Sequence, residues 1–447
     1  MLCTGILINS GVEASTVNGN FMTKNIISVT GVAEVFGDGE KIIAAILEYP
    51  SAISAQNVSP EDFVVEGKKI EAVYTNDKPE ITNKNRIGRF VILKFAYENT
   101  AFDGNLSQKP NAEKHLEKNQ GGKDAPRHSD RKLPDLSFSV KQISNIKGEN
   151  DTTYLASDEA VESTFTQAPV IDSFKQLTYT DKNGVSMPYN IYLPKNFDAK
   201  KKYPLVVFIA DASANINEPT TPLFQGNGAT VFASPEWQKN HECIVLAPQY
   251  TASLVEKLGM MTTDENVWTP GLTLVTSLIF DTIDKYKVDR NRIYGTGQSQ
   301  GGMANIAISD KYPDLFAAQY LVACQWNVDE MEAIKNKNLW ITVCEGDTKA
   351  FPGMNAAVER WESLGSTIAR NADFWDSKAP VSQINKQVKE LIKQNPTANI
   401  NYTVFKGGNH MYTWSFAYNI DAIRDWLFEQ RKVIEIKQNY IKLPFKI

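Results

Sequence analysis

The chain has 447 residues, which is too long for one ordinary domain and indicates two or three. Its 42% hydrophobic and 22% charged residues are ordinary for a globular protein with a sizeable core. The formal net charge of −5 gives no electrostatic basis for binding nucleic acid or an anionic membrane, and no run approaches the roughly 20 apolar residues of a membrane-spanning helix.

The N-terminal segment 1–23 supports two interpretations. Leu2–Ile8 is short and apolar, and Val12–Ser15 is similar to a cleavage site, but a basic n-region is missing. The segment is therefore predicted to be either the remnant of a signal peptide or a disordered start. On balance it slightly favours a secreted or extracytoplasmic location over a cytoplasmic one.

Residues 24–166 contain short runs of β-branched and aromatic residues separated by turn residues, without a long helical period. The first run, Ile26–Val35, leads into the hairpin-type turn Gly37-Asp38-Gly39. Further strands are predicted at Lys41–Glu48, Phe63–Val65, Lys69–Tyr74, Gly88–Phe95 and Ser137–Ile143. This pattern indicates an all-β sandwich. Within it, the polar segment 103–134 has little to bury and is predicted to be a disordered insertion.

Residues 170–431 alternate strands with helices. Tyr203–Ala210 and Cys243–Pro248 are continuous apolar runs, which are typical of strands buried on both faces. Further strands are predicted at Arg292–Gly297, Ala317–Cys324, Leu339–Cys344 and Asn401–Phe405, and helices at Leu272–Tyr286, Gly301–Tyr312 and Phe416–Glu429. The alternation predicts a mostly parallel sheet covered by helices, so the fold class is α/β. Residues 432–447 form a short tail of alternating apolar and basic residues.

The four cysteines are far apart in the sequence: Cys3, Cys243, Cys324 and Cys344. They form no C-x-x-C pair, so the sequence indicates neither a zinc site nor a thioredoxin-like site. The last three lie in apolar strand-like runs and are predicted to be buried free thiols, with a disulfide left open. No metal and no cofactor are expected.

Gly297-Gln298-Ser299-Gln300-Gly301 matches the G-x-S-x-G pattern of a nucleophile elbow. In such an elbow the serine occupies a strained turn between a strand and a helix, which exposes its hydroxyl at the carboxyl edge of the sheet. Flanking glycines are needed because a Cβ there would collide with the tightly turned chain. A predicted strand precedes Ser299 and a predicted helix follows it, so Ser299 is the expected nucleophile.

Elimination among four histidines selects the general base. His115 and His128 lie in the polar insertion, and His241 precedes a strand at its amino end. Sites in open α/β sheets form at the carboxyl ends of strands. His410 follows the predicted strand Asn401–Phe405 after a Gly-Gly-Asn turn, so His410 is the expected base.

The acid that orients this base should lie between the serine and the histidine in the chain. Asp347 follows the apolar strand Leu339–Cys344 directly, with Gly346 allowing the turn, and is the expected acid. Asp376 and Glu345 are the reserves. The other aspartates in this interval are Asp310, Asp314, Asp329 and Asp373. Asp310 and Asp314 flank a helix end and are expected to be surface or capping residues.

A tetrahedral oxyanion needs at least two fixed donors. One is expected to be the backbone N–H of Gln300, the residue after the nucleophile. The other is expected in the loop after Tyr203–Ala210, at Ala212 or next to it at Asp211. The usual His-Gly pair of this loop is absent, and Ala210-Asp211 replaces it.

The substrate pocket is less well defined by the sequence. A loop between Pro248 and Leu272 leaves the carboxyl end of a strand and contains Met260, Met261, Trp268 and Pro270. Trp268 and Trp414 are therefore candidates to line the pocket, although core packing explains both tryptophans equally well. Gln298, which precedes the nucleophile, is a further candidate.

Several segments carry a family resemblance. VDRNRIYGTGQSQGGMANIAISDKYPDLFAA resembles the elbow region of bacterial esterases related to polyhydroxybutyrate depolymerases and feruloyl esterases. ISVTGVAEVFGDGEKIIAAILEYP, CEGDTKAFPG and HMYTWSFAYNIDAIRDWLFEQ are similar to esterases that carry an N-terminal immunoglobulin-like domain. The resemblance covers about Lys24 to Gln430, and the insertion and the tail depart from it.

The resemblance implies an α/β-hydrolase fold after an immunoglobulin-like domain, a Ser299, Asp347 and His410 triad, and no cofactor. It implies short- to medium-chain acyl esters as substrates, free or linked to a polysaccharide. It leaves open whether the extra domain assembles a homo-oligomer or shapes the pocket. Two other interpretations are a serine peptidase of the same fold and a catalytically inactive binding module.

Overall fold

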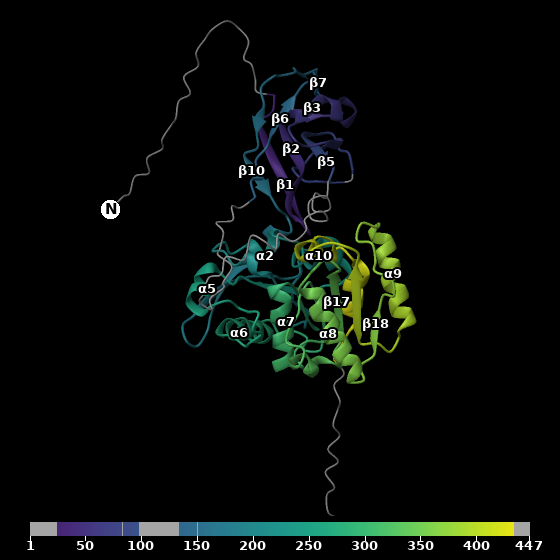
Figure 1. The fold of residues 1–447 in the computed structure, drawn as a ribbon. Helices are drawn as coiled ribbons and strands as arrows, with labels where there is room; N and C mark the ends of the chain where they lie inside the picture. Colours follow the sequence, from purple (N-terminus) through teal and green to yellow (C-terminus); the bar gives the residue numbers. More distant parts are fainter. Residues whose placement is uncertain (1–24, 83, 98–133, 150, 433–447) are drawn as a thin grey trace, which may run out of the picture. The chain divides into compact units, whose positions relative to one another are not determined.

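The structure is a computed structural model that describes residues 25–82, 84–97, 134–149 and 151–432 (Figure 1). The predicted N-terminal start lies outside the described residues, as do the polar insertion and the C-terminal tail except for Pro134 and Lys432. The chain divides into two compact units. The described part of the first comprises 25–30, 45–82, 84–95, 137–149 and 151–165, and that of the second comprises 31–44, 96–97, 134–136 and 166–432.

The β-rich part of the chain folds into sheets in which the pairs β4–β5, β3–β6, β6–β9 and β7–β8 are antiparallel. Five strands form one sheet in the order β10-β1-β2-β5-β4, three form a second in the order β3-β6-β9, and β7 pairs with β8. Their bounds are β1 Ser28–Phe36, β2 Gly39–Ile53, β3 Phe63–Val65, β4 Ile70–Asn76, β5 Gly88–Phe95, β6 Ser139–Gln142, β7 Ile146–Lys147, β8 Thr153–Tyr154, β9 Val161–Glu162 and β10 Phe165–Gln167. The predicted strands Phe63–Val65 and Gly88–Phe95 are confirmed as β3 and β5.

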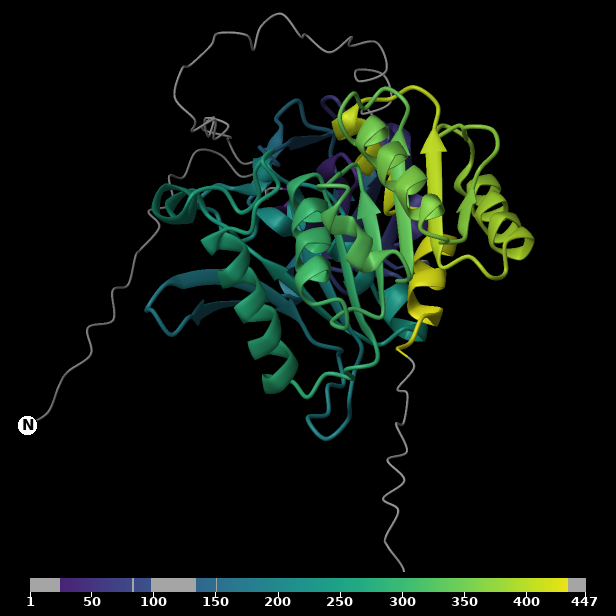
Figure 2. The same ribbon diagram turned by 60° about the horizontal axis from the view of Figure 1, so that its bottom comes forward.

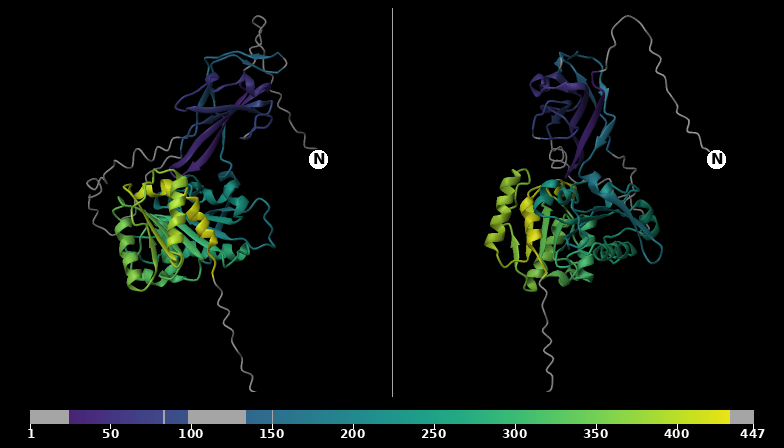
Figure 3. Two further views of the ribbon diagram at one scale, coloured as in Figure 1. Left: turned by 90° about the vertical axis from the view of Figure 1, so that its right-hand side faces the viewer. Right: turned by 180° about the vertical axis from the view of Figure 1, so that it is seen from behind.

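The first two of these sheets are joined through their buried faces, as in a β-sandwich. The Tyr49 hydroxyl on β2 donates to the Gln142 side-chain oxygen on β6 at 3.0 Å, and both residues are buried. The rings of Phe95 and Phe138 meet edge to face at 6.0 Å between centroids. Figure 3 shows these strands from two sides. The predicted immunoglobulin-like sandwich is confirmed.

The second unit is built on a nine-stranded sheet in the order β11-β12-β14-β13-β15-β16-β17-β19-β18. Strand β12 runs antiparallel to both of its neighbours, β11 and β14. The strands from β14 to β18 in this order run parallel to one another. The bounds are β11 Lys175–Thr180, β12 Ser186–Tyr192, β13 Leu205–Ile209, β14 Ile244–Pro248, β15 Ile293–Gln298, β16 Ala318–Val322, β17 Leu339–Cys344, β18 Ile368–Arg370 and β19 Ile400–Phe405.

Helices cover both faces of this sheet, because its central strands bury successive side chains on opposite sides. On β13, Val207 packs in one core with α6, α7 and α8, whereas Val206 packs in the other core with α3, α4, α9 and α11 (Figure 2). The helices are α2 Thr221–Phe224, α3 Thr230–Ala233, α4 Pro235–Asn240, α5 Ala252–Leu258, α6 Pro270–Lys285, α7 Gln300–Lys311, α8 Ala350–Ser363, α9 Val381–Gln394, α10 His410–Ala417 and α11 Asp421–Glu429.

Short 3-10 helices complete the described elements: Ala55–Asn57, Pro60–Asp62, Ile171–Ser173, Ala212–Ala214 and Glu330–Ile334. The predicted alternation of strands and helices is confirmed, and this arrangement is an α/β-hydrolase fold. None of the described helices combines the length and the hydropathy that crossing a bilayer requires.

One predicted element is wrong. The single helix expected at Phe416–Glu429 is two helices, α10 and α11, separated by 418–420. Tyr418 turns inward in this break, where its ring meets the rings of Phe208 and Tyr320 edge to face at 5.9 and 5.5 Å. A buried aromatic at the junction keeps the apolar pattern continuous, so periodicity alone does not reveal the break.

Candidate active site

Ser299 occupies the sharp turn between strand β15 and helix α7. Its backbone has φ 49° and ψ −120°, a region that residues with a Cβ rarely adopt. The preceding residue ends the strand and the following residue starts the helix. The predicted strand–turn–helix context of the pentapeptide is therefore present.

The glycines of the motif are required by close backbone contacts. A Cβ on Gly301 would lie 1.8 Å from the carbonyl oxygen of Ile209, and a Cβ on Gly297 would lie 2.5 Å from the same oxygen. A Cβ on Gly302 would lie 2.5 Å from the Cys324 sulfur. The elbow and β13 thus approach each other more closely than any side chain permits.

The three residues expected to act together are in hydrogen-bond contact. His410 Nε2 lies 2.7 Å from Ser299 Oγ, and His410 Nδ1 lies 2.6 Å from Asp347 Oδ2. The three residues follow the carboxyl ends of β15, β17 and β19, which are parallel strands of one sheet. This is the geometry of a serine nucleophile, a base and an orienting carboxylate.

Asp347 is fixed by backbone donors as well as by the histidine. It is 1% exposed, and its Oδ1 accepts hydrogen bonds from the N–H groups of Lys349 at 3.1 Å and Ala350 at 2.9 Å. Burial raises the pKa of the Asp347 carboxyl, but the hydrogen bond and charge of His410 and these two N–H groups outweigh it. The pKa of Asp347 therefore lies below the ordinary 3.8, and the group is a carboxylate at neutral pH.

The reserve acids have other partners. Glu345 accepts a hydrogen bond from the N–H of Gly407 at 3.1 Å, and Asp376 accepts one from the N–H of Lys378 at 2.9 Å. Asp314 forms an exposed ion pair with Lys337 at 2.9 Å. Neither reserve carboxylate forms a described hydrogen bond to His410.

Helix α10, which begins at His410, is capped by a residue that the sequence analysis named only as part of a turn. Asn409 is the N-cap of α10, and its side-chain oxygen accepts a hydrogen bond from the N–H of Tyr412 at 2.9 Å. This cap starts the helix at His410. The signal was available, because asparagine directly before a helix is a preferred capping residue.

The loop expected to carry the second oxyanion donor follows β13, which pairs with β15. It contains the 3-10 helix Ala212–Ala214, with Asp211 as N-cap. Ala212 is half-buried at the start of this turn. Gln300 is the first residue of α7, where backbone N–H groups have no partner within the helix. Both expected donors are thus N–H groups at helix starts.

Of the three pocket candidates, two lie near the triad and one lies elsewhere. Trp414 lies beside the base, with its ring edge to face with the His410 ring at 5.3 Å. Gln298 is 1% exposed, and its amide nitrogen donates to Asp211 Oδ2 at 3.1 Å. Trp268 does not lie at the nucleophile. Its indole N–H donates to Thr273 at 2.8 Å, and its ring meets Tyr312 just beyond the opposite end of α7.

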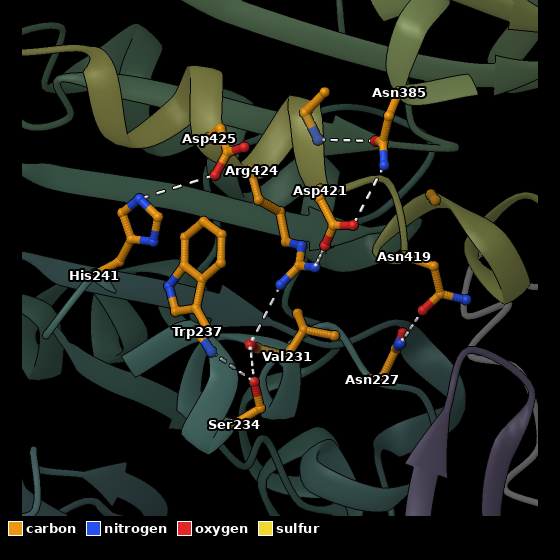
Figure 4. A network of polar contacts seen from close by, with 12 residues as sticks. Asn227, Val231, Ser234, Trp237, His241, Asn385, Asn419, Asp421, Arg424 and Asp425 are labelled. Atoms are coloured by element: carbon orange, nitrogen blue, oxygen red, sulfur yellow. Dashed lines mark hydrogen bonds and ion pairs between the residues drawn. The ribbon is translucent and has the colours of Figure 1, made fainter. Parts of the chain in front are cut away.

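The position of His241 agrees with its exclusion. It precedes β14, its ring stacks on Trp237 at 4.2 Å, and it lies 3.9 Å from Asp425 (Figure 4). Ser299 lies at the opposite, carboxyl end of the parallel strands. His115 and His128 lie outside the described residues. In the described part of the chain, no cluster of His, Cys, Asp or Glu is suited to hold a metal ion.

Comparison with known proteins agrees with this architecture. Residues 28–155 match the family described as the esterase Ig-like N-terminal domain. A thermostable esterase of known structure covers 91% of this chain and 100% of its own, with 24% identity and a TM-score of 0.69. The two chains therefore share one fold, an immunoglobulin-like domain followed by an α/β-hydrolase unit. No curated protein matches the sequence.

More distant structures share only part of the chain. A feruloyl esterase module from Clostridium thermocellum covers 56% of this chain and 86% of its own, with 17% identity and a TM-score of 0.37. A prolyl endopeptidase covers 67% of this chain and 44% of its own, with 10% identity and a TM-score of 0.39. At these scores neither bears on the function of this chain.

Proposed function

We propose that the protein is a serine carboxylesterase that hydrolyses short- to medium-chain acyl esters through an acyl-enzyme intermediate. The observation that carries the proposal is the continuous hydrogen-bonded chain from Ser299 Oγ through His410 to Asp347, on a strained strand-to-helix turn. This chain supplies a nucleophile, a base and a group that fixes the imidazole, as acyl transfer requires.

In the proposed reaction, Ser299 Oγ attacks the ester carbonyl carbon while His410 Nε2 takes the serine proton. Collapse of the tetrahedral intermediate breaks the bond to the alcohol, which leaves with the proton held by His410. Water then attacks the acyl carbon while His410 accepts a proton from it. The bond between the acyl carbon and Ser299 Oγ breaks, His410 returns the proton to Oγ, and the free acid is released. Asp347 holds Nδ1 and stabilises the imidazolium in both steps.

Backbone donors stabilise the charge that develops on the carbonyl oxygen. We assign these donors to the N–H groups of Gln300 and Ala212. Removing one such donor in comparable sites costs about 3 kcal/mol in the transition state. Trp414 beside His410 provides an apolar wall near the reacting carbonyl.

The nature of the alcohol and the assembly state belong to the same proposal. Acetyl or feruloyl groups on a plant polysaccharide are candidate natural substrates by analogy with the esterases that the sequence resembles. Assembly into a homo-oligomer through the immunoglobulin-like domain is the second part of this analogy. Both parts are testable once the basic ester activity has been measured.

Hydrolysis of a p-nitrophenyl ester series from acetate to palmitate tests the proposal. We expect the wild type to be most active on the shorter chains and Ser299→Ala to lose about 10⁴-fold or more in kcat/KM. Ser309→Ala is the control, since Ser309 is a buried serine of the same helix, α7, whose hydroxyl donates to Gln319 at 2.9 Å. A matched amide series separates an esterase from a peptidase, and a wild type inactive on every ester contradicts the proposal.

A further inference from the structure

Both variable positions of the G-x-S-x-G pentapeptide are glutamine, and both side chains bind the loop opposite the nucleophile. The Gln298 amide nitrogen donates to Asp211 Oδ2 at 3.1 Å. The Gln300 side-chain oxygen accepts a hydrogen bond from the Asn215 amide at 3.0 Å. The two glutamines, which flank Ser299 in the sequence, therefore form hydrogen bonds with the first and last residues of the loop 211–215.

The four residues of these contacts are all buried, with exposed fractions of 4% for Asp211, 3% for Asn215, 1% for Gln298 and 4% for Gln300. Hydrogen bonds between such groups are shielded from competing water, and an unpaired member would be costly. The loop is thus held in register with the elbow by directed contacts rather than by apolar packing alone.

Asp211 connects the hydrogen bond from Gln298 to the backbone of the loop. Its Oδ1 accepts hydrogen bonds from the N–H and the hydroxyl of Ser213, the former at 2.8 Å, while its Oδ2 accepts from Gln298. The described partners of this buried carboxylate are all neutral donors. One carboxylate therefore orients the 3-10 turn that starts at Ala212 and ties it to the residue before the nucleophile.

A cavity lies behind this loop. It is lined by loop residues, by residues of β13 and β14, and by Met261 and Val275. The cavity is small, about 10 Å³, and a shift of about 1 Å at a catalytic group can cost about 10²-fold in rate. Directed contacts hold this loop on two sides: the two glutamines of the elbow bind Asp211 and Asn215, and the Gln249 amide donates to the carbonyl oxygen of Ala214 at 2.9 Å.

We propose that the side chains of Gln298 and Gln300 are positioning residues that hold the loop 211–215 so that the N–H of Ala212 faces the carbonyl oxygen of an ester bound at Ser299. This inference rests on the proposed esterase function. The contacts act on the transition state more than on ester binding, so their loss lowers kcat and leaves KM nearly unchanged.

The test is a charge exchange across the 3.1 Å contact between Gln298 and Asp211. In Gln298→Glu two carboxylates face each other, and we expect kcat to fall about tenfold or more at pH 8. The ratio of variant to wild-type kcat should rise as the pH falls, because the two carboxylates can then share a proton.

The double variant Asp211→Asn/Gln298→Glu restores a donor opposite a carboxylate, and kcat should return to within about threefold of the wild type. Asp211→Asn alone should lose less kcat than Gln298→Glu does, because no two carboxylates then face each other. The Gln298 side-chain oxygen has no hydrogen-bond partner among the described residues, so its amide can turn to accept from the new amide group. Gln238→Glu is the matched control. Gln238 is a buried glutamine of α4, away from the elbow helix, and its side-chain amide donates to the carbonyl oxygens of Phe232 and Cys243.

The outcomes separate this inference from the proposed function. A wild type that hydrolyses no ester overturns the proposed function and the inference with it. An active wild type with Gln298→Glu folded and fully active overturns the inference alone. So does a folded double variant whose kcat stays as low as that of Gln298→Glu, or a Gln238→Glu variant with the same loss of kcat and the same pH dependence.

Discussion

At the residue scale, the backbone of Ser299 shows where the fold accepts local strain. A positive φ of 49° at a residue with a Cβ costs about 1–3 kcal/mol and persists only where the surroundings fix it. Here the surroundings are Gly297 and Gly301, which let the carbonyl of Ile209 approach the turn. The strain lifts the serine hydroxyl to the edge of the sheet, 2.7 Å from His410.

Asp347 is the residue whose role is easiest to isolate. Because its pKa lies below the ordinary 3.8, its carboxylate is ionised at neutral pH and loses its charge only as the pH falls through that lowered pKa. Asp347→Asn keeps the shape of the side chain, but an amide in place of the carboxylate favours the wrong tautomer of the His410 imidazole. We expect kcat on p-nitrophenyl acetate to fall about 10⁴-fold at pH 7.5. A loss below about tenfold in a folded variant would assign the orienting role to another acid.

At the element scale, helix α7 carries Asp310, which the proposed reaction does not use and which is not the surface or capping residue that the sequence suggested. Both carboxylate oxygens of Asp310 are buried without a hydrogen-bond partner among the described residues. Burial, with a contribution from the charge of Glu330, raises the pKa of Asp310 to about 7. The folded state therefore binds a proton at Asp310 that the unfolded chain releases near pH 3.8.

This shift fixes the sign of a pH effect on stability. The stabilisation from protonated Asp310 is fully present below about pH 4 and is lost as the pH rises through about 7. Asp310→Asn should remove that dependence and raise the free energy of unfolding by about 1–3 kcal/mol at pH 8, with little gain at pH 4. Urea unfolding at both pH values measures it, with the exposed Asp314→Asn as control. An equal effect at both pH values would contradict the assignment.

The elements themselves show what a sequence can and cannot reveal. Strands Phe63–Val65, Gly88–Phe95 and Leu339–Cys344 were predictable because burial on one or both faces leaves a clear apolar pattern. The break between α10 and α11 was not predictable, since Tyr418 continues that pattern. For Trp268 the sequence left pocket lining and core packing open, and its contacts with Thr273 and Tyr312 favour packing, because a loop's point of departure from the sheet does not fix where its side chains pack.

The candidate site divides in the same way. Motif spacing and chain order brought Ser299, Asp347 and His410 to one sheet edge, since they follow parallel strands. Chain order cannot show that Gln298 and Gln300 reach across to the loop 211–215, because those contacts join residues more than eighty positions apart. The ranges 24–166 and 170–431 stay our proposal for the two domains, since the compact units group 31–44 with the second.

At the scale of the whole molecule, the buried thiols report on global unfolding. Cys243, Cys324 and Cys344 are buried free cysteines. Burial raises the pKa of the Cys243 and Cys344 thiols to about 12, and that of Cys324 is raised as well. The reactive thiolate is therefore scarce in the folded state at pH 8.

We expect these thiols of a Cys3→Ser variant to react with a disulfide reagent only as fast as the second unit unfolds. In denaturant all should react at once, and a titration with Ellman's reagent in both conditions measures this. Ser299→Ala serves as a control for indirect effects of the active site. Rapid reaction of any of these thiols in the native protein would contradict their burial.

The central claim is that Ser299 becomes acylated because His410 activates it. The most direct measurement is to let the protein react with p-nitrophenyl acetate to steady state and then to quench the reaction. The covalent adduct is mapped by peptide mass spectrometry. The account predicts an acetyl group on Ser299, formed within the burst of p-nitrophenol release and much reduced in His410→Ala. An active wild type whose adduct lies on another residue, or whose labelling of Ser299 does not depend on His410, would contradict it.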